Sequence, residues 1–248
     1  MKKIIIFLFT IVLVLEGLYY YYEQKNTEVL LSGRVIGFDI ENIEQENENR
    51  KGSIIDTSLK SIGTVTFINK DDNSFAALGH SISNKSNIKD LQGKCYSIDF
   101  GYVKKANSNK AGKIIADLNE NEEIGELNTG NQYGIYGNFN NLYGDYQSIQ
   151  TENRFKIKTG TAYILINVDG YGIQKYEVEI KGINYIAFNR NIRIQVTSDE
   201  LIKLSGGIVR GMSGAPLIQN DKLIGAINCV NENNPLDAYA IFIDKLVK

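Results

Sequence analysis

Residues 211–227 read GMSGAPLIQNDKLIGAI, a glycine-rich turn around Ser213 followed by two short apolar runs. Asn220 and Asp221 separate these runs, and both residue types favour tight turns between strands. Short β-rich runs between turn signals recur upstream, at residues 29–40, 63–68, 162–168, 176–180 and 192–196. Repeated strands of this kind predict an all-β sandwich or barrel, with one short helix near residues 198–204 that Ser198 or Thr197 would cap.

The composition is that of a globular protein. Hydrophobic residues make up 43% of the 248 residues and charged residues 23%, which excludes collagen-like, wholly disordered and multi-span membrane chains. A formal net charge of −2 argues against nucleic acid as a partner. One histidine and two cysteines cannot assemble a Cys/His zinc site, and we expect no metal and no cofactor. Cys95 and Cys229 are expected to be buried free thiols, with a disulfide as the alternative.

The N-terminal segment has the composition of a membrane anchor. Lys2 and Lys3 precede an apolar run over residues 4–15, and apolar character resumes from Leu18 to Tyr22. Read to Tyr22, the segment approaches the roughly 20 residues that span a bilayer as a helix. The two lysines predict a cytoplasmic start, so the rest of the chain is expected outside the cytoplasm. A signal peptide would fit the apolar core, but no small-residue cleavage site follows it. A buried core helix is the other alternative.

Two features are typical of nucleophilic catalysis. A Gly-x-Ser-Gly turn exposes the serine hydroxyl and aims main-chain N–H groups, here of Gly211 and Ser213, at a developing oxyanion. A plain glycine turn between two strands would have the same sequence. His80 is the only histidine, and it ends an apolar run where a general base would be presented. A histidine that precedes the serine in the chain is the order of chymotrypsin-like double barrels.

The motifs also resemble a known family. The chain reads SIGTVTF at 61–67, FAALGH at 75–80 and GGIVRGMSGAPLIQNDKLIGA at 206–226. Shorter matches are IGELN at 124–128, YGIYG at 133–137, Asn234-Pro235 and YAIFI at 239–243. Over about residues 53–246 this resembles the SpoIVB (stage IV sporulation protein B) peptidase family. The resemblance implies a membrane-anchored serine endopeptidase with a trypsin-like double β-barrel, which acts on a protein substrate between the two membranes of a developing endospore.

Carried over residue by residue, the resemblance implies His80 as general base, Ser213 as nucleophile, and the N–H groups of Gly211 and Ser213 as the oxyanion hole. The family places an aspartate 15 positions before the nucleophile, where this chain has Ser198 followed by Asp199. We rank Asp199 first as the orienting carboxylate. Glu126 and Asp117 are the alternatives, because they follow His80 where a chymotrypsin-like barrel places its acid.

The expected organisation has three parts. Residues 1–22 form a cytoplasmic tip and membrane anchor, residues 23–52 a linker with a short β segment, and residues 53–248 the peptidase domain. The family's PDZ module between anchor and protease is missing, and residues 41–51 and 120–123 are predicted to be solvated loops. Two other functions stay open: a protease-like protein of the membrane surface that binds a partner without cleaving it, and a lectin or adhesin.

Overall fold

The computed structural model describes residues 10–14, 27–44, 56–79, 87–88, 91–107, 110–142, 144–231 and 233–247. One fifteen-stranded sheet runs through these residues. The strands of its N-terminal half are β2 (Val35–Glu44), β3 (Asp56–Ile68), β4 (Ser74–Ala77), β6 (Gln92–Lys104), β7 (Lys113–Asn131) and β8 (Gly134–Phe139). Those of its C-terminal half are β10 (Gly160–Ile166), β11 (Gln174–Ile183), β12 (Ile192–Val196), β13 (Pro216–Gln219), β14 (Lys222–Val230) and β15 (Asp237–Phe242).

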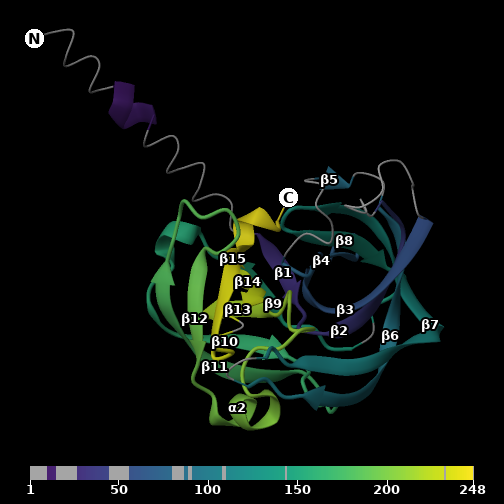
Figure 1. Cartoon of the computed structure of the whole chain (residues 1–248). Helices are drawn as coiled ribbons and strands as arrows, with labels where there is room; N and C mark the ends of the chain where they lie inside the picture. The colour runs from purple at the N-terminus through teal and green to yellow at the C-terminus, as the bar shows by residue number, and fades with distance from the viewer. Residues whose placement is uncertain are drawn as a thin grey trace, which may run out of the picture.

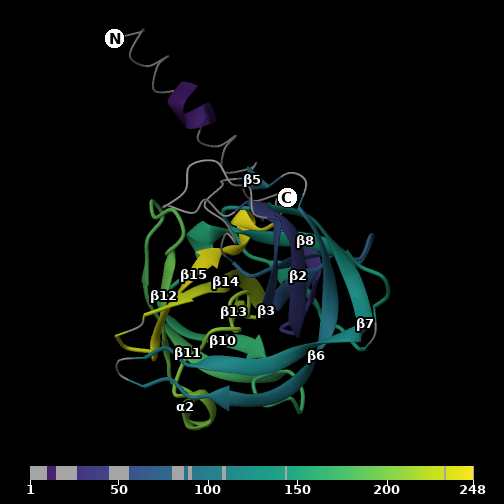
Figure 2. The same cartoon turned by 45° about the vertical axis from the view of Figure 1, so that its right-hand side comes forward.

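The strand pairing closes two antiparallel barrels. In the first, the order β3-β2-β6-β7-β8-β4 returns to β3; in the second, the order β10-β11-β12-β15-β14-β13 returns to β10. Two short strands join the barrels, because β1 (Glu28–Leu31) pairs with β3 and β9, and β9 (Ser148–Thr151) pairs with β14. The remaining strand, β5 (Asn87–Ile88), pairs with β7. The all-β prediction is confirmed, and Figures 1 and 2 show the two barrels side by side.

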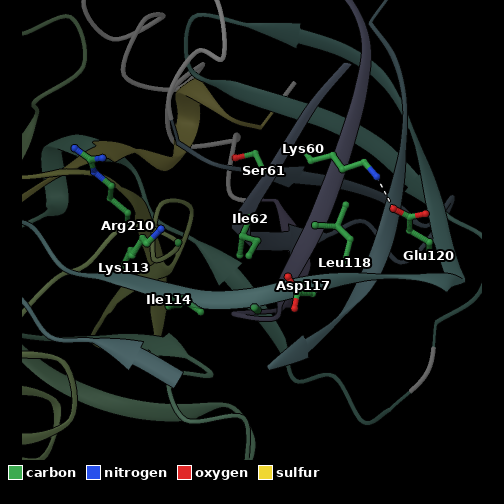
Figure 3. Close-up of a pocket in the computed structure, with 11 residues that line it drawn as sticks. Lys60, Ser61, Ile62, Lys113, Ile114, Asp117, Leu118, Glu120 and Arg210 are labelled. Carbon is green, nitrogen blue, oxygen red and sulfur yellow. Dashed lines mark hydrogen bonds and ion pairs between the residues drawn. The ribbon is translucent and has the colours of Figure 1, made fainter. Parts of the chain in front are cut away.

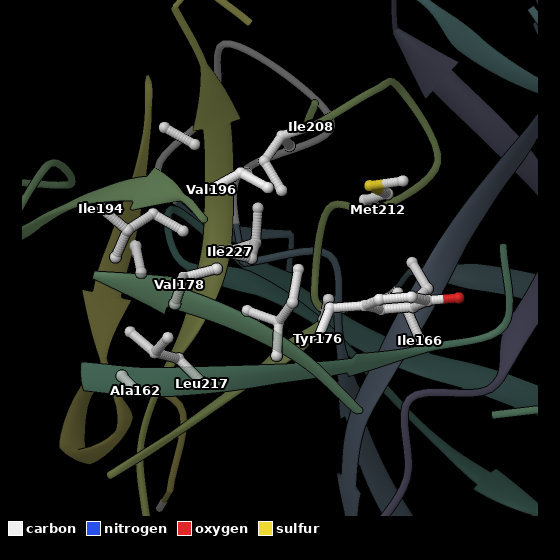
Figure 4. Packing of buried hydrophobic residues seen from close by; sticks show 14 of the residues in the cluster. Ala162, Ile166, Tyr176, Val178, Ile194, Val196, Ile208, Met212, Leu217 and Ile227 are labelled. Atoms are coloured by element: carbon white, nitrogen blue, oxygen red, sulfur yellow. The ribbon is translucent and has the colours of Figure 1, made fainter. Parts of the chain in front are cut away.

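Alternating side chains fill each barrel. In β12, Ile192, Ile194 and Val196 point inward between the exposed or half-buried residues, which is the period-two pattern of a half-buried strand. Figure 4 shows the second-barrel core, where Tyr176 and Met212 pack among the aliphatic side chains. A further cluster takes its members from both barrels and holds them together: Val29, Leu31, Phe67, Ala76, Ile149, Ile218, Leu223, Ala226, Ile241, Ile243 and Leu246.

The predicted short helix is confirmed. α2 (Asp199–Ser205) begins after Ser198, whose hydroxyl accepts a hydrogen bond from the Leu201 N–H at 3.3 Å. The helix ends at Gly206, which has φ +75° and closes it with a left-handed residue. In Figures 1 and 2, α2 lies at the lower end of the molecule.

Two segments differ from the expected organisation. β1 and β2 lie within residues 23–52, and β2 is a full member of the first barrel, so that barrel begins upstream of residue 53. Residues 120–123 were predicted to be a loop, and this is wrong, because they lie inside β7. Their charged side chains bond to neighbouring strands: Glu120 pairs with Lys60, and Glu123 pairs with Lys94 at 2.6 Å. Salt bridges across the outer face of a barrel allow a charged run to be a strand.

Of the expected anchor, only residues 10–14 fall within the described part, and they are helical. Within the described ranges, no helix combines the length and the apolar character needed to cross a membrane.

Candidate active site

Ser213 lies in a turn that is bonded to both barrels. Its carbonyl accepts a hydrogen bond at 2.9 Å from the N–H of Thr64 in the first barrel. The next residue, Gly214, donates its N–H to the carbonyl of Ile227 in the second barrel at 2.8 Å. Two buried threonine hydroxyls on β3 complete the support, because Thr64 bonds the Gly211 carbonyl and Thr66 the Gly214 carbonyl, both at 2.7 Å. The turn therefore sits at the seam between the barrels.

Gly214 leaves no room for a side chain. Its φ is +94°, and a Cβ built there would lie 2.0 Å from the Thr64 carbonyl oxygen and 2.6 Å from the Leu78 nitrogen. Gly211 also has a positive φ, +101°. Glycine adopts such angles without steric cost, and at Gly214 it also lets the two barrel backbones approach closely.

The Ser213 hydroxyl points at two main-chain carbonyls. Its Oγ lies 2.7 Å from the oxygen of Leu78 and 3.0 Å from the oxygen of Asn228. A hydroxyl has one proton, so it donates to one of these carbonyls at a time. The Asn228 side chain donates to the carbonyl of Gly79 at 2.6 Å, which fixes the end of this segment on β14. His80 follows Gly79 directly in the chain and lies outside the described residues.

Two main-chain donors beside Ser213 are free of hydrogen bonds to any described residue. In the described part of the chain, no acceptor takes a hydrogen bond from the N–H of Gly211 or of Ser213. The residues between and after them do donate, Met212 to Val209 at 3.1 Å and Gly214 to Ile227. Alternating free and bonded N–H groups around a serine form the donor pattern that an oxyanion hole requires.

A cavity of about 510 Å³ opens in front of Ser213. Its lining is mainly aliphatic and comes from both barrels: Leu59, Ser61, Ile62, Leu78, Ile208, Val209, Arg210, Gly211, Ser213, Ile227, Asn228, Cys229 and Val230. Both cysteines are free, as predicted: Cys95 is buried in the first barrel, and half-buried Cys229 lines the cavity. Burial raises the pKa of the Cys229 thiol.

A second cavity of about 480 Å³ adjoins the first and shares Ser61, Ile62, Arg210 and Gly211 with it. Figure 3 shows its charged lining, in which Lys113 and Arg210 lie together and Lys60 is bonded to Glu120. A peptide that crosses Gly211 would therefore pass from an aliphatic cavity to a charged one.

Of the three candidate carboxylates, only Asp117 shares a cavity with a residue of this turn, Gly211. Asp199 is the exposed first residue of α2, whose last residue, Ser205, accepts a hydrogen bond from Ala106. In Figure 1, α2 lies at the lower end and β4, the strand that leads to His80, lies in the upper half. Glu126 is exposed on β7, and Asp117 lines the second cavity. None of the three lines the cavity that contains Ser213.

The end of β4 lies beside the turn that leads into β8. Ala77, at the end of β4, pairs with Ile135, and a Cβ on Gly134 would lie 2.6 Å from the Ala77 carbonyl oxygen. The turn at residues 131–133, which reads Asn-Gln-Tyr, therefore lies beside the residues that lead into His80.

Comparison with known proteins agrees with the motifs. The model of the family SpoIVB peptidase S55 matches residues 29–247. The chain belongs to the SpoIVB peptidase S55 family. The family is one of serine peptidases. The family match also begins inside β1, in agreement with the early start of the first barrel.

Among solved structures, the chain is similar to an HtrA-type protease, AlgW with a decapeptide, at 10% sequence identity and a TM-score of 0.44. The match covers 86% of this chain and 60% of that one, so this chain spans less than two thirds of that protease. Among curated proteins, none matches this chain.

Proposed function

We propose that this SpoIVB peptidase S55 family member is a membrane-anchored serine endopeptidase of sporulation-type regulated proteolysis, with Ser213 as nucleophile and His80 as general base. The observation that carries the proposal is the turn at the barrel seam. Ser213 lies on an aliphatic cavity beside two unused N–H donors, and it contacts the segment that leads directly into His80. A plain structural turn would not need donors left unpaired toward a cavity.

The substrate would bind as an added strand along the end of β14. There β14 pairs with β15 on one side, while its pairing with β13 ends at Ala226. Within the described ranges, no strand covers the other edge at residues 228–230. An extended peptide can pair with such an edge through its main chain, and its side chain at the scissile residue would enter the aliphatic cavity.

In the acylation step, the Ser213 hydroxyl turns from the carbonyls of Leu78 and Asn228 and attacks the scissile carbonyl carbon. His80 takes the hydroxyl proton and passes it to the leaving amine as the C–N bond breaks. The N–H groups of Gly211 and Ser213 stabilise the oxyanion. Water then attacks the acyl-enzyme, His80 takes the water proton, and Ser213 is released as its hydroxyl.

The proposed site differs from the sequence expectation in the group that orients His80. Asp199 remains the family-based candidate, with Glu126 and Asp117 as alternatives. Since none of the three lines the Ser213 cavity, we propose that Ser213 and His80 act without an orienting carboxylate. Loss of an orienting carboxylate lowers the rate by about 10⁴ without abolishing catalysis, so such an enzyme would be slow.

A fluorophosphonate probe tests the proposal because it labels an activated serine without knowledge of the substrate. We expect labelling of the full chain in detergent micelles, and loss of labelling in Ser213→Ala and in His80→Ala. Ser61→Ala is the matched control, since Ser61 lines the same cavity and should not affect labelling. Labelling that survives Ser213→Ala, or that disappears in Ser61→Ala, would contradict the assignment.

One observation favours a second function, a protease-like protein that binds a peptide without cleaving it. The Ser213 hydroxyl donates to main-chain carbonyls, and no carboxylate of the described residues lines its cavity. A folded chain that stays unlabelled while binding an extended peptide would support this function.

We also propose where the enzyme acts. The apolar segment 4–22 would anchor the chain, and Lys2 and Lys3 would hold its start in the cytoplasm. The peptidase domain would then face the outside, which in a sporulating cell is the space between the two forespore membranes. Protease protection of the domain in sealed vesicles, and its retention on membranes after a wash at high pH, test this placement.

A further inference from the structure

The loop between β11 and β12, residues 184–191, displays apolar side chains to solvent. Ile186 is 96% exposed, Phe188 57% and Tyr185 43%. Phe155, 62% exposed, comes from the short 3₁₀ helix η1 (Arg154–Lys156) and stacks on Tyr185 with 5.4 Å between ring centroids. We call these four side chains the apolar patch. Single exposed apolar residues are common, but a contiguous group of this size marks an interaction site.

The loop is held in shape by buried polar groups. Asn191 is only 1% exposed, and its side chain donates to the carbonyls of Asn184 at 3.0 Å and Ala187 at 2.7 Å. The Lys245 ammonium donates to the carbonyl of Phe188 at 2.6 Å and to the side chain of Asn191 at 2.9 Å. These bonds fix the loop backbone with the apolar side chains outward, so their exposure is built into the loop.

The patch lies where the N-terminal segment enters the fold. Thr27 and Thr151 exchange two hydrogen bonds of 2.9 Å, and Thr151 is three residues before η1. The chain from Tyr22 to Thr27 covers five residue steps, which span at most about 18 Å. The end of the apolar segment 4–22 is therefore within about 18 Å of Thr27. In Figures 1 and 2, the β11–β12 loop lies at the upper end of the second barrel, opposite α2.

Basic residues are frequent in the chain segments next to the patch. They are Arg154, Lys156, Lys158, Arg190 and Lys245, and the acidic residues among them are Glu152 and Asp244. Arg154 is paired with Asp244 through two bonds of 2.6 Å. Lys156 and Lys158 are exposed on either side of buried Ile157. Aromatic and aliphatic tips with a basic rim are typical of surfaces that sit in the headgroup layer of anionic membranes.

We propose that the apolar patch of Phe155, Tyr185, Ile186 and Phe188 rests in the headgroup layer of an anionic bilayer, as a second membrane contact besides the N-terminal segment. This rests on the anchoring part of the proposed function. The short connection from Tyr22 to Thr27 holds the upper end of the second barrel at the membrane, and the patch would stop the domain from turning about that connection. Arg190, near the end of the loop, contacts Cys229, which lines the Ser213 cavity, so this loop connects the patch to the cavity wall.

The absence of tryptophan from the chain allows a direct test. Ile186→Trp places the only tryptophan of the chain on the patch without disturbing packing, because the side chain is almost fully exposed. Tyr171→Trp is the matched control: Tyr171 is 92% exposed at the opposite end of the ten-residue strand β11, about 30 Å away. The full-length variants are reconstituted into vesicles of phosphatidylglycerol and phosphatidylcholine, with and without bromine on the acyl chains near the headgroups.

We expect the brominated lipid to quench the Ile186→Trp emission at least roughly twofold and to leave the Tyr171→Trp emission unchanged. Equal emission and quenching at the two sites would overturn the proposal. A blue shift of Ile186→Trp that needs a higher protein concentration but no lipid would identify a second copy of the chain as the occupant, and would also overturn it. A wash at high pH tests the anchor separately. If the N-terminal segment does not anchor the chain, the chain leaves the washed vesicles, and the proposal of a second membrane contact then fails as well.

Discussion

Gly214→Ala should disrupt the contact between the two barrels and abolish the reactivity of Ser213. The new Cβ would lie 2.0 Å from the Thr64 carbonyl oxygen and 2.6 Å from the Leu78 nitrogen, two backbone atoms of the first barrel. Neither atom can rotate away, so the turn or the barrel must move. An alanine at φ +94° costs about 1–2 kcal/mol in backbone strain alone. Overpacking of a well-filled site adds about 1–3 kcal/mol, which gives about 2–5 kcal/mol in all.

Gly160→Ala separates the two contributions. Gly160 has φ +118°, and a Cβ there would meet no atom within 4 Å. It should therefore carry the backbone strain without the collision. Replacing glycine by alanine also lowers the entropy of the unfolded chain, which raises the free energy of unfolding. This increase is the same in both variants, so it cancels when they are compared.

Urea denaturation followed by circular dichroism provides the assay. With a slope of roughly 2 kcal/mol per molar urea, Gly214→Ala should lower the midpoint by about 1–2.5 M and Gly160→Ala by about 0.5–1 M. Fluorophosphonate labelling should be lost in Gly214→Ala under conditions where it is still folded, and kept in Gly160→Ala. Equal midpoints for the two variants would refute the inference that Gly214 is required for the close approach of the barrels.

Three further results follow from the site. Asp199→Asn should leave fluorophosphonate labelling of Ser213 within about 10-fold of the parent rate, because removal of a true orienting carboxylate costs about 10⁴; a loss near that size would restore Asp199 to the site. Alkylation of Cys229 by iodoacetamide should be slow at neutral pH and faster as the pH rises, since burial raises the pKa of the thiol and only the thiolate reacts. The alkylated chain should lose probe labelling of Ser213, whereas Cys229→Ala should keep it after the same treatment. Fast alkylation at neutral pH would contradict the burial of the Cys229 thiol. Thr66→Val should cost about 1–3 kcal/mol in urea denaturation, because it leaves the Gly214 carbonyl without its buried donor, whereas an unchanged midpoint would show that this bond contributes nothing.

Strands with local alternation could be predicted from the sequence, and strands held by distant charges could not. Residues 192–196 alternate cleanly, and the predicted strand has the same bounds as β12. Residues 120–123 contain three glutamates and one asparagine, which locally favours a solvated loop. Their partners are on other strands: Lys60 on β3, and Lys94 and Ser97 on β6. Only the register between strands reveals these pairs, and register between distant strands is not visible in a local pattern.

The same limit applies to the candidate site. The turn around Ser213 is specified by adjacent residues, so its place could be predicted. The orienting group depends on which side chain lies beside the end of β4, and that is decided by the pairing of β4 with β8, about 60 residues further along the chain. Counting positions from the serine pointed to Asp199, which lies at the exposed start of α2.

The barrel seam explains why the serine turn could not be told from an ordinary glycine turn by its own sequence. The carbonyls of Gly211 and Gly214 are held by threonine hydroxyls that lie 147 and 148 residues earlier in the chain. The N–H of Gly214 is held by β14, so the free donors of Gly211 and Ser213 exist only while both barrels are docked. The reactive geometry is therefore a property of the contact between the barrels, and perturbations of that contact, such as Gly214→Ala, should remove serine reactivity before they unfold either barrel.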